Sequence, residues 1–98
     1  MTKADLRKIV VGAIRDLVTS LGRKCPEVTD DMRPIPDLGL ESADGIWIAC
    51  ELAAKGIPVP LRDNPFVADE DGGRRPRSVR EMIETCGGYP AAEEGKPK

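Results

Sequence analysis

One serine stands between two carboxylates in the segment Asp37–Asp44, which reads Asp-Leu-Gly-Leu-Glu-Ser-Ala-Asp. Ser42 follows a turn glycine, Gly39, and precedes an apolar stretch, so we expect it at the start of a helix. Free backbone N–H groups and the positive end of the helix dipole favour a phosphate ester at such a position. The simpler interpretation of this serine alone is a capping hydroxyl. The chain has no histidine to serve as a triad base, so nothing indicates a self-activated nucleophile.

The first element that must position this segment is a helix predicted over Lys3–Leu21. Thr2 followed by Asp5 suits an N-cap, and Gly22 suits a stop. Apolar residues recur at helical spacing within it, namely Leu6, Ile9, Val10, Ala13, Ile14, Leu17, Val18 and Leu21. This period predicts a helix that buries one face.

A long connection and a second helix follow. The connection over residues 22–41 contains prolines that exclude a continuous helix, and its apolar residues are expected to pin it onto the helices. The second helix is predicted over Ser42–Lys55 and ends at Gly56. Its predicted core stripe consists of Ile46, Ala49, Leu52 and Ala53.

The C-terminal part predicts two further helical pieces. A short helical turn is expected within Asp63–Asp71, with Phe66 as a core anchor, followed by a flexible basic loop. The pair Ser78 and Glu81 has capping-box spacing, so a last helix should run from Val79 to about Cys86. We therefore predict an all-α fold, a small four-helix bundle of three main helices and one short helix. It would form one domain over residues 1–87, followed by a disordered tail, residues 88–98.

Charge is unevenly distributed along the chain. The net charge is −2, but residues 27–51 hold seven acids against one base, Arg33, which gives this segment −6. An acidic zone around Ser42 would attract a basic partner surface, although it also suits a surface that merely aids solubility. The later Arg74–Arg80 cluster is interpreted as a solvated loop and helix start, with a partner contact as the minor alternative. No basic stripe interleaved with aromatics is present, so nucleic-acid binding is not expected.

The cysteine pattern and the hydropathy of the chain favour a cytoplasmic location. Cys25, Cys50 and Cys86 are odd in number and lack CxxC spacing, so we expect free thiols, with Cys50 buried. Without histidine, neither a zinc site nor a redox site is predicted. No apolar run approaches the length of a membrane span, and the charged N-terminus is unlike a signal peptide. A cytoplasmic monomer without metal or membrane insertion is expected.

The segment Asp37–Asp44, in this order of elements, resembles the acyl carrier protein family. The family's attachment motif usually reads Asp-Ser-Leu after a Leu-Gly-Leu-like lead-in. Leu52–Pro60 resembles the stretch after the family's second helix, and Arg77–Ile83 resembles the start of its last helix. The resemblance covers roughly residues 3–86. It implies the same four-helix bundle, with the attachment serine at position 42.

The resemblance also implies a function. Ser42 would carry the 4′-phosphopantetheine arm of coenzyme A, installed by a separate phosphopantetheinyl transferase that uses a divalent metal. The thiol of the arm would hold acyl groups as thioesters for acyl-transferring or condensing enzymes with basic docking surfaces. Fatty-acid, polyketide or specialised lipid synthesis would be the setting, and the chain itself would not be an enzyme. The implied partner-docking positions are Glu41, Ala43, Asp44 and Trp47.

Three of these positions depart from the family pattern. Glu41 stands where aspartate is usual, Ala43 where leucine is usual, and Trp47 where an acid is usual. Trp47 lies four residues after Ala43, so it either supplies the apolar area that a leucine there would offer or is simply a core residue. The departures keep a second function open, an interaction module of the same fold that is never modified. A peptidyl or aminoacyl carrier is disfavoured by the acids beside Ser42, and a small enzyme ranks last.

Overall fold

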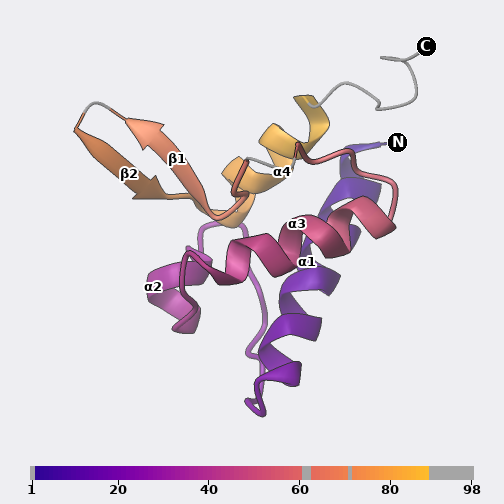
Figure 1. The fold of residues 1–98 in the computed structure, drawn as a ribbon. Helices are drawn as coiled ribbons and strands as arrows, with labels where there is room; N and C mark the ends of the chain where they lie inside the picture. Colours follow the sequence, from indigo (N-terminus) through magenta and orange to yellow (C-terminus); the bar gives the residue numbers. More distant parts are fainter. Residues whose placement is uncertain (1, 61–62, 71, 89–98) are drawn as a thin grey trace.

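The computed structural model describes residues 2–60, 63–70 and 72–88. In chain order these residues form α1 (Lys3–Ser20), α2 (Pro34–Leu38), α3 (Asp44–Ala54), β1 (Val67–Glu70), β2 (Gly73–Pro76) and α4 (Val79–Gly88). Helix α1 packs against both α3 and α4, and the β1–β2 hairpin projects away from the helices (Figure 1). The described part of the chain is therefore a small mixed α/β fold of four helices and one two-stranded antiparallel sheet.

The predicted all-α bundle is wrong because the segment between α3 and α4 is a hairpin. Strand β1 lies within the segment Asp63–Asp71, where a helical turn was expected, and β2 forms within the expected basic loop. The strands pair from Val67 with Pro76 to Glu70 with Gly73. Opposite charges face each other across them, which stabilises antiparallel pairs. The sequence after Glu70 is Asp-Gly, which favours a two-residue hairpin connection.

The predicted helices at the two ends of the fold are confirmed. At the start of α1, Asp5 N–H donates to the Thr2 hydroxyl at 3.1 Å and Thr2 N–H donates to the Asp5 carboxylate at 3.3 Å. The Thr2 N–H lowers the pKa of Asp5 below its ordinary value. Helix α4 ends at Gly88, slightly later than predicted. Apart from Gly88, the predicted tail lies outside the described residues.

The connection between α1 and α3 contains an additional short helix. Pro34 is the first residue of α2, where a missing N–H costs nothing, so this proline starts a short helix that the sequence reasoning did not predict. Asp37 Oδ2 accepts the Arg33 N–H at 2.7 Å. The helix ends at Leu38 and is followed by the capping residue Gly39, whose φ of 69° favours glycine. As expected, apolar residues of the connection reach the core, with Val28, Leu38 and Leu40 all buried.

The same connection is tied to the start of α4. Val79 N–H donates to the Met32 carbonyl at 2.8 Å, and Arg80 N–H donates to the Asp30 carbonyl at 2.9 Å. These bonds satisfy N–H groups that have no partner within the first turn of a helix. The connection between α1 and α3 therefore helps to hold the first turn of α4 in place.

The core lies where α1, α3, α4 and the start of the hairpin meet. Phe66, directly before β1, is fully buried, as predicted. Ile14 of α1, Leu52 of α3 and Met82 of α4 are also fully buried. Within the described ranges, no helix has both the length and the apolar character that crossing a membrane requires.

Candidate functional site

Ser42 lies in the exposed turn immediately before α3. The helix begins two residues later than predicted, at Asp44. The Ser42 carbonyl accepts the Gly45 N–H at 3.0 Å. The Ser42 hydroxyl has no hydrogen-bond partner among the residues that the structure describes. This hydroxyl therefore does not act as a helix cap, and it is open to solvent.

Neighbouring residues hold the turn in place of the serine hydroxyl. Asp44 Oδ2 accepts the Glu41 N–H at 2.8 Å, and Asp44 N–H donates to the Glu41 carbonyl at 2.9 Å. The Ile46 N–H donates to the Ala43 carbonyl at 3.2 Å. Within the described ranges the N–H groups of Ser42 and Ala43 have no acceptor. A phosphate ester on Ser42 would therefore have two free backbone donors beside it, which suits an anion at a helix start.

Asn64, which sequence reasoning did not single out, clamps this turn from the segment just before β1. Its Nδ2 donates to the Ser42 carbonyl at 2.6 Å, and its Oδ1 accepts the Phe66 N–H at 3.0 Å. Gly45 permits this approach, because a Cβ there would lie 1.8 Å from Asn64 Oδ1. The turn is thus joined to the residue that anchors the core. No local sequence signal could reveal the contact, because 22 positions separate Asn64 from Ser42.

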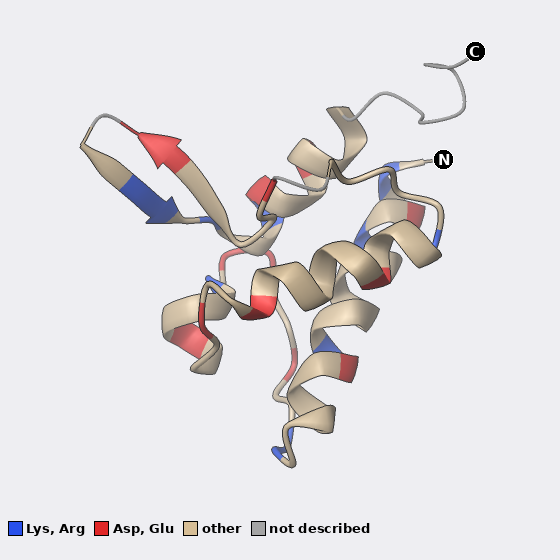
Figure 2. Cartoon of the chain, in the orientation of Figure 1, with Lys and Arg blue, Asp and Glu red and all other residues tan. Residues whose placement is uncertain are grey.

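Acidic side chains surround the turn. Glu41 is exposed and Asp44 half-buried, and Asp37 of α2 is exposed nearby in the chain. Figure 2 shows the acidic segments gathered on α2, on the turn and at the start of α3. The negative charge that the sequence places around Ser42 is therefore displayed at the surface beside it. Such a surface attracts basic partners and repels acidic ones.

The outer face of α3 carries apolar side chains close to Ser42. Ile46 is 67% exposed and Trp47 is 39% exposed. Ala43, one turn before them, is exposed as well. Trp47 is therefore not a fully shielded core residue, and it shares a helix face with Ala43 as the spacing predicts. Exposed large apolar residues that lie together are typical of interaction surfaces.

The predicted core stripe of α3 is only partly correct. Leu52 is buried, but Ile46 is largely exposed and Ala53 is exposed. The buried face instead contains Gly45 and Ile48 together with Leu52. Gly45, against which the Asn64 side chain packs, thus takes the place on the buried face that the prediction gave to Ile46.

A shallow apolar cavity lies on this outer face. Its volume is about 110 Å³, and it is lined by Ile46, Ala49, Cys50, Ala53 and Val59. Small side chains on α3 thus leave space at the surface of the helix. Cys50 is exposed, so its predicted burial is wrong. Cys86 of α4 is the buried thiol, and burial raises its pKa to about 11.

Three of the four arginines in the Arg74–Arg80 cluster, Arg74, Arg75 and Arg80, are engaged in ion pairs within the fold. Arg74 Nε lies 3.5 Å from Asp69 Oδ1 across the hairpin, and Arg80 Nη1 lies 2.5 Å from Asp31 Oδ1. The prediction of a solvated loop is wrong in that Gly73–Pro76 forms strand β2, but both arginine side chains are more than half exposed. Arg74 pairs within the hairpin, whereas Arg80 joins α4 to a residue 49 positions away.

Arg75 links the hairpin to α4. Its Nη1 and Nη2 donate to the two oxygens of Glu81 at 2.9 Å and 2.7 Å, and its Nε donates to Glu70. This arginine and the Ser78 N–H lower the pKa of Glu81 to about 2. The two carboxylates in turn raise the pKa of Arg75 above its ordinary value. A bidentate arginine–carboxylate pair fixes orientation as well as charge, so it holds the hairpin against the helix.

The five predicted site residues lie together at one end of α3. Glu41, Ser42, Ala43 and Asp44 form the turn, and Trp47 follows one helical turn later. Among the described residues, no group of three or more histidine, cysteine, aspartate or glutamate side chains is placed to hold a metal ion. Comparison with known proteins finds no matching family model, no matching curated protein and no matching solved structure.

Proposed function

We propose that this chain is a carrier of acyl groups, held as thioesters on a 4′-phosphopantetheine arm attached to Ser42. The observation that carries the proposal is the exposed Ser42 hydroxyl, which makes no hydrogen bond to any residue that the structure describes, in a turn that other residues hold in shape. The attached arm would supply the thiol that bears the acyl group. The chain's own residues present and orient the attachment oxygen.

The attachment reaction requires a separate enzyme. Esterification would join Ser42 Oγ to a phosphorus of the coenzyme A pyrophosphate, with the adenosine bisphosphate part as leaving group. The chain contains no histidine, so a phosphopantetheinyl transferase must supply the base that removes the hydroxyl proton. The unpaired N–H groups of Ser42 and Ala43 support the proposal because they favour an anionic ester at this position.

The surroundings of Ser42 suit docking to acyl-transferring or condensing enzymes. Glu41 and Asp44 offer negative charge, while Ile46 and Trp47 offer apolar area on the same end of α3. A partner with a basic rim around an apolar patch would match both features. We place this carrier in the cytoplasm as a monomer, in fatty-acid, polyketide or specialised lipid synthesis.

Intact mass spectrometry tests the attachment. The chain is incubated with coenzyme A, a divalent metal and each of several permissive phosphopantetheinyl transferases. We expect the mass to rise by one phosphopantetheinyl group, the Ser42→Ala variant to gain nothing, and the Ser20→Ala variant to gain as the parent does. Ser20 is the matched control because it is an exposed serine whose hydroxyl is bonded to the Leu17 carbonyl at 2.7 Å. No gain with any transferase would contradict the proposal.

A second candidate is an interaction module that is never modified. The hairpin in place of the expected third short helix favours it, as do Ala43 at the position after the serine and the exposed Ile46 and Trp47. The same α3 face would then bind a partner without any prosthetic arm. This candidate predicts that Ser42→Ala leaves partner binding unchanged, whereas Trp47→Ala weakens it.

A further inference from the structure

Helix α3 is apolar on its outer face as well as on its buried face. Its exposed residues, the outer strip of α3, are all apolar, namely Ile46, Trp47, Cys50, Ala53 and Ala54. By contrast, the exposed residues of α1 are charged or polar apart from Ala4. A helix at a protein surface usually turns polar residues outward, and one that is apolar all round is covered by other protein. The outer strip has no such cover within the described part of the chain.

The apolar cavity beside the outer strip has the size of one side chain. Its volume is about 110 Å³, and Ile46, Cys50 and Ala53 of the strip line it together with Ala49 and Val59. Pockets for small organic ligands usually measure about 300–1,000 Å³, so this cavity is too small for such a ligand. An apolar lining also offers water no hydrogen-bond partners. A single aliphatic side chain of another protein suits both the size and the lining.

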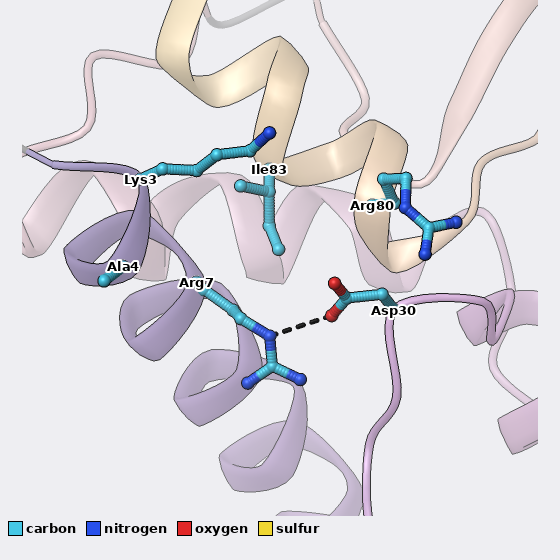
Figure 3. A pocket seen from close by; sticks show the side chains of 6 residues that line it. All are labelled: Lys3, Ala4, Arg7, Asp30, Arg80 and Ile83. Atoms are coloured by element: carbon cyan, nitrogen blue, oxygen red, sulfur yellow. Dashed lines mark hydrogen bonds and ion pairs between the residues drawn. The ribbon is translucent and has the colours of Figure 1, made fainter.

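The larger cavity of the fold differs from this one. It measures about 290 Å³ and lies between α1, Asp30 and α4 (Figure 3). Its two arginines are already engaged, Arg7 by Asp30 at 2.8 Å and Arg80 by Asp31. An exposed lysine, Lys3, is then the one charged group of that lining without an ion pair in the described ranges. A single exposed lysine does not select a ligand, whereas the outer strip combines shape, apolar area and flanking charge.

Negative charge flanks the outer strip at its N-terminal end. Glu41 is exposed and Asp44 is half-buried there. At the other end the ammonium of Lys55 lies 3.8 Å from the Glu51 carboxylate, so this base is already engaged. Figure 2 shows the acids at the start of α3 and towards its end, with no charged residue between them. Charge complementarity therefore favours a basic occupant of the strip.

The same charges disfavour two other occupants. A second copy of this chain would add its own Glu41, Asp44 and Glu51 to the contact. Anionic membrane lipids would bring phosphate groups to these carboxylates. Like charges repel in both cases, so the favoured occupant is a basic segment of another protein.

A helix is the form of that segment that best fits the outer strip. The backbone groups of α3 are bonded within the helix, so an extended segment could pair none of its own N–H and C=O groups with them. A partner helix satisfies these groups internally and presents apolar side chains at i, i+4 and i+7. Ile46, Cys50 and Ala53 have this same spacing, over about 10 Å at 1.5 Å per residue. Two such helices interlock when a side chain of one enters a hole on the other.

We propose that the outer strip of α3 binds a basic amphipathic helix of a partner protein. One aliphatic side chain of that helix enters the cavity beside Ala53, and its basic side chains lie near Glu41 and Asp44. The partner would be one of the enzymes that dock beside Ser42, so this assignment rests on the proposed function. Binding of the helix needs no prosthetic arm, so the unmodified chain is sufficient to test it.

Titration of the unmodified full chain with a synthetic peptide tests this partner. The peptide is about 18 residues long, since shorter helices are marginal in water, and carries leucine at i, i+3, i+4 and i+7 with lysine elsewhere. Trp47 is the one tryptophan of the chain, so its fluorescence reports binding without a label. We expect a saturable blue shift of its emission. A peptide with glutamate in place of lysine should give no shift, and a scrambled peptide of the same composition should bind about ten-fold more weakly.

Two matched variants test the cavity itself. Ala53→Leu fills the cavity from the surface of α3 and should raise the Kd for the lysine peptide about ten-fold, because one aliphatic side chain of the peptide loses its place. Ala54→Leu enlarges an exposed alanine of the same strip that does not line the cavity, so it should leave the Kd unchanged. Leucine is a good helix former at both positions.

A second pair of variants tests the charge. Glu41→Gln should raise the Kd about three-fold at low salt, and the difference should disappear at high salt. Glu84→Gln removes the same charge from an exposed position on α4 and should leave the Kd unchanged.

Three outcomes would overturn the partner helix. They are the absence of a saturable shift, equal binding of the glutamate or scrambled peptide, and equal Kd values for Ala53→Leu and Ala54→Leu. The attachment test has a separate outcome. A mass gain without peptide binding would retain the carrier and exclude this partner, whereas peptide binding without a mass gain would retain the partner surface and exclude the carrier.

Discussion

Two serines stand at helix starts in this fold, and the structure uses them differently. The Ser78 hydroxyl accepts the Glu81 N–H at 3.2 Å, while the Ser78 N–H donates to the Glu81 carboxylate at 2.9 Å. Ser42 has no such reciprocal pair, because the residue three positions later is Gly45. In that turn the reaching carboxylate is Asp44, and it bonds the N–H of Glu41. At the start of α3 the bonded pair is Glu41 and Asp44, so it begins one residue before the serine. The Ser78 hydroxyl is therefore used as a helix cap, whereas the Ser42 hydroxyl remains available to a partner.

The clamp on the Ser42 turn is expected to produce the largest effect. In Gly45→Ala the new methyl group must displace the Asn64 side chain and break its bonds to Ser42 and Phe66. Losing two hydrogen bonds costs about 2 kcal/mol, and the better helix propensity of alanine returns about 0.5–1 kcal/mol. We therefore expect a net loss of roughly 1–1.5 kcal/mol in the free energy of unfolding, measured by urea denaturation.

A matched glycine and a double mutant sharpen this test. Gly12→Ala in α1 meets no atom within 4 Å, so it should stabilise the fold. Gly45→Ala should also stabilise once Asn64→Ala has removed the opposing side chain. If Gly45→Ala has the same sign in both backgrounds, the clamp does not exist as described.

Removing each serine hydroxyl tests the comparison directly. Ser78→Ala should lower the free energy of unfolding by about 1 kcal/mol, the usual cost of losing a helix cap. Ser42→Ala should change it by less than about 0.5 kcal/mol, as for an exposed group without partners. Parallel urea denaturation of the two variants measures both values. Equal losses would mean that Ser42 also caps its helix.

Acid should weaken the α4 start through Glu81. Its pKa is about 2 in the folded protein against an ordinary value of 4.5, so the unfolded chain takes up the proton first as pH falls. The stabilising contribution of Glu81 is therefore complete above about pH 4.5 and is lost as pH falls toward 2. Thermal unfolding across this window should show a smaller fall for Glu81→Gln than for the parent chain.

Two controls define the origin of that acid effect. Glu84→Gln, an exposed carboxyl on the same helix, should retain the full fall in stability. Because the Arg75–Glu81 pair is itself about one-third exposed, high salt should reduce its contribution. A fall that is identical in all three proteins would assign the acid sensitivity to other groups.

The smallest effect concerns Trp47 on the outer face of α3. Its side chain is 39% exposed, so a soluble quencher should reduce its fluorescence efficiently, and its emission should lie to the red of a buried tryptophan. A fully shielded, blue-shifted tryptophan would refute its place on a docking surface.

The helices at the ends of the chain are predictable because their signals are local. The Thr2–Asp5 and Ser78–Glu81 pairs and the helical spacing of apolar residues lie within a few positions of each other. Helix α2 was not predicted because Pro34 was interpreted as a residue that interrupts helices, although proline is tolerated in the first turn of a helix.

The hairpin escapes prediction for a different physical reason. Val67–Glu70 and Gly73–Pro76 contain few apolar residues, so no alternation of buried and exposed positions marks them as strands. Cross-strand charge pairs and contacts to α4 stabilise them instead. The Asp-Gly pair between the strands is the one usable signal.

The candidate site also has features that the sequence predicts and features that it does not. The position of Ser42 before a helix and its acidic neighbours follow from adjacent residues. The Asn64 clamp and the rotation of the α3 stripe depend on contacts between distant segments, which a single sequence does not reveal.

The bonds from Val79 and Arg80 back to Met32 and Asp30 carry a kinetic consequence. The side-chain partners Asp31 and Arg80 are 49 positions apart. The contacts that hold the start of α4 can therefore form only after the chain between these two residues has closed into a loop. Helix α1 has no such requirement, since its cap is made by its own first residues. Order should therefore spread from the N-terminal helix and reach the C-terminal helix last.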